Sequence, residues 1–291
     1  MHNWIPKVIP ILGLAIAFSG LSPVVNAQLP QAQSNPSINN PTSVEPNSQL
    51  SNQPDLTLLA KTVANFLKSD RYQTESELHL SGTSSGTTVT SAAQVKTLAQ
   101  SPQQFRSEIT FGMPGSSGGR RYLVISNGKQ VWIYSPDLKQ YAVMDYESFN
   151  KSDNSFLIGM SSSLFLEIAP DFQQMREQGS ISDTNIREAL QELLRSEKTT
   201  IKGGTRRLEG RDYYVYEYID PKDGYTINAL VATNTATVEQ IRIRSQAEGL
   251  DVVINEKILR RVENPAIAAN TFSFSPPQGA TKVKSISLEP F

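Results

Sequence analysis

The stretch Arg120–Met144 constrains the fold most, because it predicts three consecutive antiparallel strands. Asn127-Gly128 separates two runs of β-branched and aromatic residues, and Asn-Gly readily adopts the positive φ angles of a type I′ hairpin turn. We therefore expect Tyr122–Ser126 to pair with Gln130–Tyr134. A second turn, at Ser135-Pro136-Asp137, returns the chain through Met144 and adds the third strand of a β-meander.

Both faces of this meander carry apolar side chains. We expect one face to be a buried layer that comprises Leu123, Ile125, Val131 and Ile133. The opposite face then comprises Tyr122, Val124, Trp132 and Tyr134. Because both faces are apolar, both need a cover other than water. This requirement favours functions in which an apolar surface is used.

The N-terminus has the pattern of a secretory signal peptide over residues 1–27. Lys7 precedes an uncharged run, Val8–Leu21, and Val25-Asn26-Ala27 supplies small residues at the usual cleavage positions. The run is shorter than the roughly 20 residues of a membrane helix, although an uncleaved anchor is the alternative. The chain contains no cysteine, so no disulfide and no lipid-modified N-terminal cysteine is available. We expect a soluble protein exported to the periplasm.

Residues 28–54 are dominated by Gln, Asn, Pro and Ser, with Glu45 as their only charge. Such a segment buries too little apolar surface to offset the entropy of ordering, which predicts a disordered linker. Residues 55–291 are then expected to form one domain. Removing Lys7 from the 27 basic residues leaves 26 against 28 acidic ones, a balance without long-range attraction to nucleic acid.

Within the domain, Asp55 is placed to cap a first helix, and strands are expected over Tyr72–Ser81 and Thr87–Ala99. The inward side of that helix comprises Leu56, Leu59, Val63, Phe66 and Leu67. In the next strand Phe105, Ile109 and Phe111 share one side, and this alternation indicates one dry face.

The middle of the chain differs in kind. Ser155–Leu166 contains no charge and is too apolar for an exposed helix. Asp183 or Thr184 then caps an amphipathic helix whose inward residues are Ile186, Leu190, Leu193 and Leu194. Four strands linked by short turns follow, at 212–219, 225–232, 238–245 and 250–262. This order predicts an α+β fold with a large curved antiparallel sheet.

Residues 115–119 satisfy G-x-S-x-G, the pattern of a serine-hydrolase elbow, but a strand rather than a helix is expected next. His79 is the only histidine after residue 27 and precedes the serine, so catalysis is disfavoured. One histidine and no cysteine also argue against a zinc or other transition-metal site, and we expect no cofactor. Two carboxylate pairs, Glu75 with Glu77 and Asp220 with Asp223, could perform acid-base work or bind calcium. The first pair fits a polar strand face and the second fits a turn, so structural roles are favoured.

Two further patterns have structural and functional interpretations. The basic doublets 120–121, 206–207 and 260–261 lack the interleaved aromatic residues of a nucleic-acid site. Tyr214, Tyr216 and Tyr218 form a same-face aromatic row, which suits carbohydrate or lipid contact and, more often, cross-strand packing.

Three motifs in order resemble the periplasmic lipoprotein carrier family LolA and its relatives, which include the mycobacterial lipid-binding proteins LppX and LprG. They are Ser101-Pro102-Gln103-Gln104-Phe105-Arg106-Ser107-Glu108, the hairpin Val124–Pro136 followed by Gln140, and Phe272-Ser273-Phe274-Ser275-Pro276-Pro277-Gln278-Gly279-Ala280. The resemblance spans most of Leu56–Val283. It implies an unclosed, strongly curved antiparallel β-barrel, or half-barrel, with helices covering its mouth and an interior that accepts acyl chains.

The resemblance also implies a function without catalysis. We expect a monomeric carrier or binding protein for the acyl chains of lipoproteins or lipids, with a cavity and helical lid formed by Phe105, Ile109, Phe111, Leu123, Ile125, Val131, Trp132, Ile133, Phe156, Leu164, Phe165, Tyr214 and Tyr216. Carriers often place a basic residue before the first proline, where it latches the lid, whereas this chain has Ser101. The alternative is an envelope sensor of the same fold that binds a protein partner.

A helical lid is the last expectation. Ser155–Ile168, together with the helix Asp183–Ser196, is proposed to cover the mouth and to move when cargo enters. Three serines interrupt the apolar residues of the first segment, and Gly159 and Pro170 allow its direction to change. A permanently packed core helix has the same sequence pattern and is the alternative.

Overall fold

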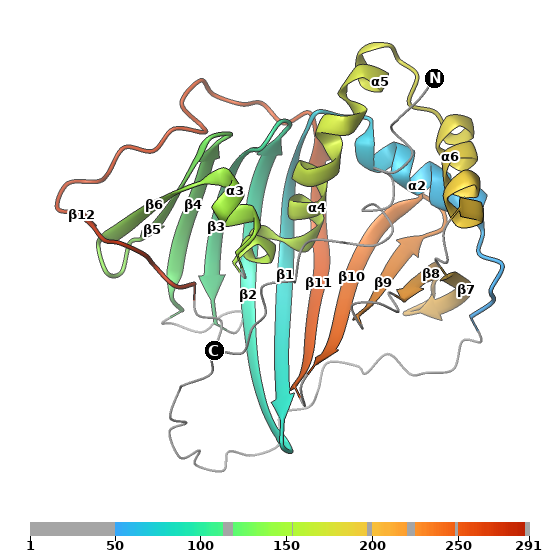
Figure 1. Cartoon of the computed structure of the whole chain (residues 1–291), viewed down its shortest axis with the longest axis horizontal. Helices are drawn as coiled ribbons and strands as arrows, with labels where there is room; N and C mark the ends of the chain where they lie inside the picture. Colours follow the sequence, from blue (N-terminus) through green and yellow to red (C-terminus); the bar gives the residue numbers. More distant parts are fainter. Residues whose placement is uncertain are drawn as a thin grey trace.

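A computed structural model of the chain describes residues 50–112, 119–152, 154–196, 200–219, 225–247 and 250–288. Across these residues, twelve strands form one sheet in the order β12-β6-β5-β4-β3-β2-β1-β11-β10-β9-β8-β7 (Figure 1). The two end strands, β12 and β7, are not paired with each other, so the sheet stays open. The expected α+β fold with an unclosed, curved antiparallel sheet is confirmed.

The sheet consists of two runs of neighbouring strands joined at its centre, where β1 pairs with β11. The first run is β1 (Arg71–Ser84), β2 (Thr87–Gln100), β3 (Gln104–Phe111), β4 (Arg121–Asn127), β5 (Gln130–Ser135) and β6 (Gln140–Asp145). The second is β7 (Thr200–Leu208), β8 (Arg211–Ile219), β9 (Tyr225–Ala232), β10 (Thr237–Ala247) and β11 (Leu250–Glu263). The short β12 (Thr281–Lys282) adds a parallel edge to β6.

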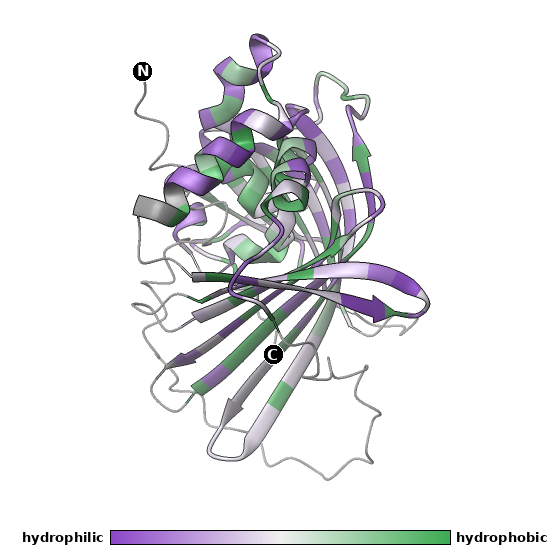
Figure 2. Ribbon diagram, turned by 90° about the vertical axis from the view of Figure 1, so that its right-hand side faces the viewer, coloured by the Kyte–Doolittle hydropathy of each residue, from purple (hydrophilic) through white to green (hydrophobic). Residues whose placement is uncertain are grey.

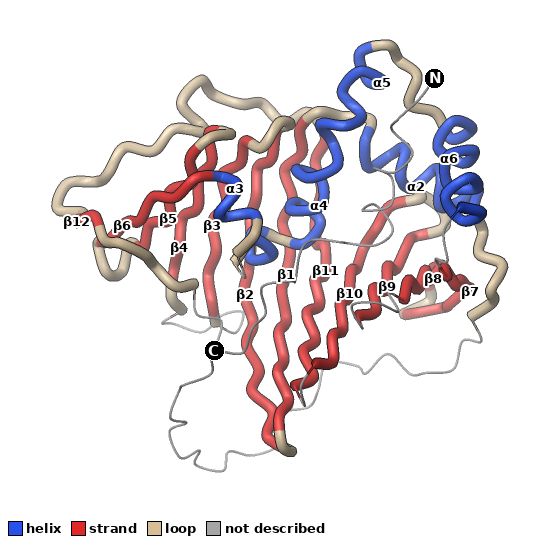
Figure 3. The backbone as a smooth tube through the Cα atoms, in the orientation of Figure 1, coloured by secondary structure: helices blue, strands red, loops and turns tan. Residues whose placement is uncertain are grey.

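The helices gather on the concave face of this sheet (Figures 1 and 2). They are α2 (Leu56–Leu67), α3 (Tyr146–Asn150), the 3-10 turn η2 (Ser155–Ile158), α4 (Met160–Ile168), η3 (Ala169–Phe172), α5 (Gln173–Glu177) and α6 (Asp183–Ser196). Figure 3 shows α4 over the middle of the sheet and α2 over β9 and β10. This open half-barrel with helices over its concave face is the architecture that the sequence resemblance implies.

Local sequence explains the first elements well. Asp55 caps α2 as expected, since its carboxylate accepts hydrogen bonds from the backbone nitrogens of Thr57 and Leu58 at 2.9 and 3.0 Å. Every second side chain is buried from Tyr72 to Leu80 in β1 and from Ala93 to Ala99 in β2, which confirms the predicted alternation there. For α6 the capping residue is Ser182 and not Asp183 or Thr184, because the Ser182 hydroxyl accepts from the nitrogen of Asn185 at 3.3 Å.

The expected layers of the β4–β5 hairpin are wrong by one residue. Asn127 belongs to β4, and its side chain accepts hydrogen bonds from Lys129 and Gln130, so the two-residue loop is Gly128-Lys129. Only Gly128 of these has a positive φ, of 90°, which matches a type II′ turn better than type I′. A shift of one residue exchanges the faces of one strand relative to its partner.

The register gives the actual layers. Leu123 lies opposite Tyr134, and Val124 lies opposite Ile133. The buried concave layer therefore comprises Tyr122, Val124, Val131 and Ile133, and the convex layer comprises Leu123, Ile125, Trp132 and Tyr134. The need for two covers is confirmed, because the convex aromatic residues pack on Phe274 from the C-terminal segment. Its ring centroid lies 6.2, 5.9 and 5.5 Å from those of Trp132, Tyr134 and Tyr141.

Strand β7 has no counterpart in the sequence prediction, because its Gly203-Gly204 pair hides the usual strand pattern. A Cβ atom at Gly203 would lie 2.5 Å from the Cε1 atom of Tyr214, so the glycine permits the close approach of that ring. Gly203 also exchanges backbone hydrogen bonds of 2.8 and 2.9 Å with Ser51. Ser51 lies within the range expected as linker, whereas residues 1–49 lie outside the described residues.

Candidate functional site

An apolar cavity lies between α2 and the strands β7–β10 on the concave face. Its volume is about 90 Å³. The lining residues are Leu59, Thr62, Val63, Phe66, Leu164, Ile201, Tyr216, Tyr218, Ile227, Ala229, Val231, Val238 and Ile241. Thr62 donates its hydroxyl to the carbonyl of Leu58 at 2.8 Å, so its polar group is already satisfied within α2. The site is therefore suited to hydrocarbon.

The tyrosine row of β8 forms one wall of this cavity and holds the start of α2. Tyr214, Tyr216 and Tyr218 lie opposite Val231, Ala229 and Ile227 in the register, which confirms that they share the concave face. The Tyr214 hydroxyl accepts from the nitrogen of Asp55 at 2.9 Å, and the Tyr216 hydroxyl donates to the Asp55 carbonyl at 2.7 Å. Cross-strand packing and helix anchoring therefore account for much of this row.

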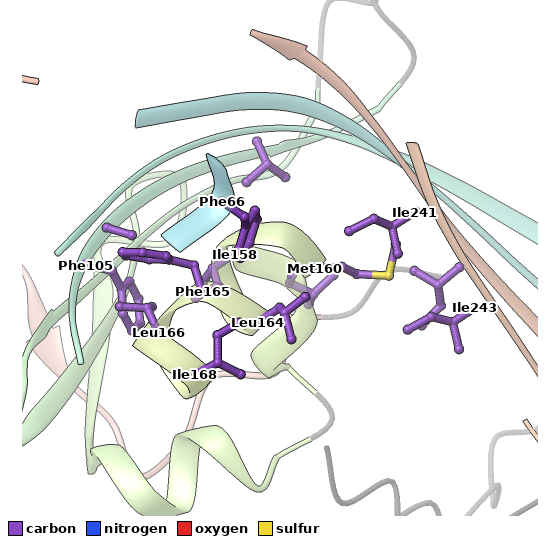
Figure 4. Packing of buried hydrophobic residues seen from close by; sticks show 14 of the residues in the cluster. Phe66, Phe105, Ile158, Met160, Leu164, Phe165, Leu166, Ile168, Ile241 and Ile243 are labelled. Carbon is purple, nitrogen blue, oxygen red and sulfur yellow. The ribbon is translucent and has the colours of Figure 1, made fainter. Parts of the chain in front are cut away.

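The far end of α2 meets α4 around a partly buried arginine. The guanidinium carbon of Arg261 lies 4.0 Å from the ring centroid of Phe66 and 3.8 Å from that of Tyr72. Its Nη2 atom donates to the Phe66 carbonyl at 3.4 Å. Phe165 of α4 packs edge-on against the ring of Phe66, with centroids 6.1 Å apart (Figure 4). It also packs edge-on against the ring of Tyr72, with centroids 5.1 Å apart. This aromatic junction, formed by Phe66, Tyr72, Phe165 and Arg261, joins α2 and α4 to the centre of the sheet.

Burial lowers the pKa of Arg261 to about 10, so its side chain is still charged at neutral pH. Alternation along β11 alone would not place Arg261 inside. A β-bulge opposite Glu75 and Ser76 leaves Leu259 unpaired and 53% exposed, and this extra residue reverses the faces that follow. The sequence reading of the 260–261 doublet missed this cation for that reason.

A second arginine also contacts helix-end carbonyls. Arg176 donates to the carbonyl of Ala169 at 2.7 Å and to that of Leu67 at 3.4 Å. Ser101, where carriers often have a basic residue, is buried and precedes a cis proline. Arg176 and Arg261 thus supply basic contacts to the helices of the concave face from other positions in the chain.

The structure distributes the thirteen predicted ligand-binding residues over three regions. Leu164 and Tyr216 line the cavity, and Tyr214 lies at the start of α2 beside it. Closed core on the concave face contains Phe105, Ile109, Phe111, Val131, Ile133 and Phe165, with Phe156 partly buried against them. The convex layer contains Leu123, Ile125 and Trp132. A role in ligand binding stays a prediction for each of them.

Other lining residues were visible only as inward-facing positions. Leu59, Val63 and Phe66 lie on the predicted inner side of α2, but the sequence does not say which strands α2 covers. Ile227, Val231 and Ile241 meet them through the pairing of β9 with β10. The missing information is the long-range arrangement of helix over sheet.

The motifs that the sequence offers for catalysis or metal binding lie on strands or outside the described residues. Among the described residues, no three His, Cys, Asp or Glu side chains lie close enough to hold a metal ion. Residues 115–118 of the G-x-S-x-G sequence, and both Asp220 and Asp223, lie outside the described residues. The chain that follows Gly119 enters strand β4, as expected, and not a helix. Glu75 pairs with Lys96 across the sheet at 3.3 Å.

Sequence comparison alone places the chain in no family, because neither a known family profile nor a curated protein sequence matches it. Several solved structures are similar in fold. LprF from Mycobacterium bovis is 12% identical, with a TM-score of 0.36, over 75% of this chain and 97% of that one. A LolA superfamily protein from Nitrosomonas europaea is 11% identical, with a TM-score of 0.29, over 74% and 97%.

The complex of MucA and MucB from Pseudomonas aeruginosa is also similar, at 11% identity and a TM-score of 0.32, over 74% of this chain and 61% of the matched one. In the described part of the chain, none of the helices has the length and apolar character needed to cross a membrane.

Proposed function

We propose that this chain is a binding protein or carrier for acylated molecules in the cell envelope, and that it holds an acyl chain in the cavity between α2 and β7–β10. The apolar lining of that cavity is the observation that carries the proposal. An acyl chain gains about 0.8 kcal/mol for each methylene that leaves water, so such a site binds cargo without a specific polar anchor.

The size of the cavity adds a condition. Sites for small molecules usually enclose about 300–1,000 Å³, which is several times the volume found here. Cargo of that size would therefore enter only if the walls move apart. Export through residues 1–27 would bring the protein into contact with lipids and lipoproteins of the envelope.

The test is native mass spectrometry of protein made with its own export signal. We expect co-purified lipid, or a mass gain after mixing with phospholipid or a diacylated lipopeptide, and the adduct identifies the cargo class. A clean apo mass in every mixture would contradict the proposal. A stoichiometric protein partner recovered from envelope extracts without lipid would instead support the sensor alternative.

A matched pair of variants ties binding to this cavity. Ala229→Phe introduces a ring into the lining, whereas Ala92→Phe introduces the same ring on the convex face of β2, where alternation places Ala92. We expect Ala229→Phe to weaken lipid binding roughly tenfold or more and Ala92→Phe to leave it unchanged. Equal effects of the two variants would locate the cargo elsewhere.

A further inference from the structure

A buried carboxylate lies where the half-barrel should be apolar. Glu256 is fully buried on the concave face of β11, two residues from Ile254 on the same side. Its cross-strand neighbours are Leu78 on β1 and Ile241 on β10, and Ile241 lines the cavity. Burying a carboxylate without hydrogen-bond partners costs several kcal/mol of folding free energy, about the stability of many domains. The groups that bind Glu256 therefore indicate its role.

Those partners belong to the start of α4. The Glu256 carboxylate accepts a hydrogen bond from the backbone nitrogen of Ser161 at 2.7 Å and another from the Ser161 hydroxyl at 2.9 Å. The hydroxyl of Ser76 on β1 also hydrogen-bonds to it. We call Glu256, Ser161 and Ser76 the α4 anchor.

Helix α4 has no cap of its own. Its N-cap residue is Gly159, with a φ of 93° and no side chain to accept from the first turn. A Cβ atom at Gly159 would lie 2.9 Å from Glu256 Oε1, so the glycine lets the carboxylate approach the helix start. Glu256, which lies 95 positions after Ser161, therefore satisfies a backbone donor that a local cap would normally satisfy.

The preceding turn is fixed in the same manner. Thr97 of β2 donates its hydroxyl to the carbonyl of Ile158 at 2.6 Å, and its oxygen lies 2.8 Å from the hydroxyl of Ser107. These contacts and the two bonds between Ser161 and Glu256 are buried. Water cannot replace buried bonds without first entering the core, so breaking them carries the full cost of exposing each group.

Helix α2 is attached differently. Its hydrogen bonds to the sheet and its turns are exposed or only partly buried. They involve Asp55 at its start, the Asn65 side chain near its end, and the carbonyls of Asn65 and Phe66, which accept from Tyr72 and Arg261. Asn65 reaches the carbonyls of Thr235 and Ala236 at 3.2 and 3.3 Å. Solvent can replace the bonds of Asp55 and of the Asn65 side chain at little net cost, whereas Arg261 holds the end of α2. Helix α6 packs on α2, with Ile186 and Leu190 buried, so the two can move together.

We propose that Glu256 is a positioning residue that fixes the N-terminus of α4 to the sheet, so that α4 is the static wall of the cavity and α2 with α6 is its moving cover. The movement of α2 with α6 rests on the proposed acyl-binding function, whereas the anchoring by Glu256 does not. The proposal replaces the expectation that Ser155–Ile168 itself moves.

Because the chain contains no cysteine, engineered cysteine pairs test which wall moves. The pair Asn65→Cys with Thr235→Cys ties α2 to the β9–β10 turn, and the pair Ser76→Cys with Ser161→Cys ties α4 to β1. The readout is the rate at which the fluorescent fatty acid cis-parinaric acid enters the protein. We expect oxidation to slow entry roughly tenfold or more in the first pair, reversibly on reduction, and less than about twofold in the second. The opposite order would overturn the proposal.

A ligand-free measurement tests the anchor itself. Amide hydrogen exchange at Ser161 should become roughly tenfold faster in Glu256→Leu, because the nitrogen loses its acceptor, while exchange in α2 stays unchanged. Glu256→Gln should restore protection, since its amide oxygen still accepts. Ser161→Ala, which keeps the backbone bond, serves if Glu256→Leu does not fold, and it should exchange at the wild-type rate at this amide.

The outcomes separate the two proposals. If reduced protein takes up no fatty acid while Glu256→Leu loses protection at Ser161, the acyl-binding function fails and the anchor stands. If fatty acid enters normally and protection at Ser161 is the same in Glu256→Leu as in wild type, the anchor fails and the function stands.

Discussion

The two halves of the half-barrel are covered by helices in different ways. Over β1–β3, α4 and η2 are embedded in the concave face, and every side chain from Met160 to Leu166 is buried. Over β7–β10, α2 spans the sheet and leaves a cavity of about 90 Å³ beneath it. Both covers are apolar toward the sheet, so hydrophobicity alone does not decide which half is filled and which can receive a ligand.

The difference lies in polar contacts made inside the core. In the filled half, Thr97 and Glu256 on the sheet bind backbone groups at helix ends, at 2.6 and 2.7 Å. Ser107 hydrogen-bonds in turn to Thr97, and Ser76 to Glu256. In the cavity half, the sheet residues that line the cavity are all apolar or tyrosine. Buried polar groups demand specific partners and so fix a geometry, whereas apolar contacts tolerate sliding.

The largest expected difference in stability comes from placing a charge in each half. Phe165→Asp puts a carboxylate into the aromatic junction, where Phe165 is 1% exposed, and we expect a loss of roughly 5 kcal/mol of unfolding free energy. Ala229→Asp puts the same group beside the cavity, where water can follow it, and should cost about 1–2 kcal/mol. Urea denaturation measures both. Similar costs would mean that the two halves are equally closed.

The junction between the halves is tested with the arginine doublet. Arg261→Ala removes a cation held between two rings and the bond to Phe66, and we expect a loss of about 3 kcal/mol. Arg260→Ala, at the exposed neighbour in the same doublet, should change stability by less than about 0.5 kcal/mol. If the two variants lose the same amount, the stacking of Arg261 contributes nothing to holding α2 and α4 together.

The cavity half alone is perturbed by Gly203→Ala. Its new methyl group would meet the ring of Tyr214, which holds the start of α2, and we expect a loss of about 1–3 kcal/mol. Gly82→Ala is the control, because there the nearest atom is Leu250 Cδ1 at 4.0 Å. Hydrogen exchange should rise at the first turn of α2 and not in α4. A rise in both helices would show that the two covers are coupled.

The same residues show which parts of the fold the sequence predicts and which it misses. Alternation, the Asp55 cap and the turn signals predict most strands and helices, because each depends on neighbours within a few positions. The Gly128-Lys129 loop, the Leu259 bulge and the Gly203 strand each depend on a partner strand, so counting along one strand misplaces a face or misses an element.

The candidate site shows the same limit more sharply. A glutamate in β11 has the sequence pattern of any strand residue, and only the placement of α4 over it reveals Glu256 as a buried partner of Ser161. Likewise the position of the cavity depends on which strands α2 covers. That arrangement joins residues far apart in the sequence, so no local pattern predicts it. The family resemblance implied an apolar interior, but it did not say where in that interior space remains.

The smallest expected effect concerns pH and the far end of α4. Burial, and then repulsion from Asp171, raise the pKa of Glu167 to about 7. A group whose pKa is raised by folding contributes stability that is complete below its unfolded pKa of about 4.5 and is lost as pH rises through about 7. Relative to Glu167→Gln, wild-type protein should therefore become less stable between pH 4.5 and 7.5.

Measuring the difference between wild type and Glu167→Gln cancels the titration of other groups, including Glu256, whose pKa burial also raises. Asp171→Asn provides the matched second variant, since loss of the repelling charge should lower the pKa of Glu167 and move the window to lower pH. A flat difference across the whole range would show that Glu167 is hydrated in the folded protein. In that case the end of α4 near Ile168 is open to water, and only its beginning, at the anchor, is fixed to the sheet.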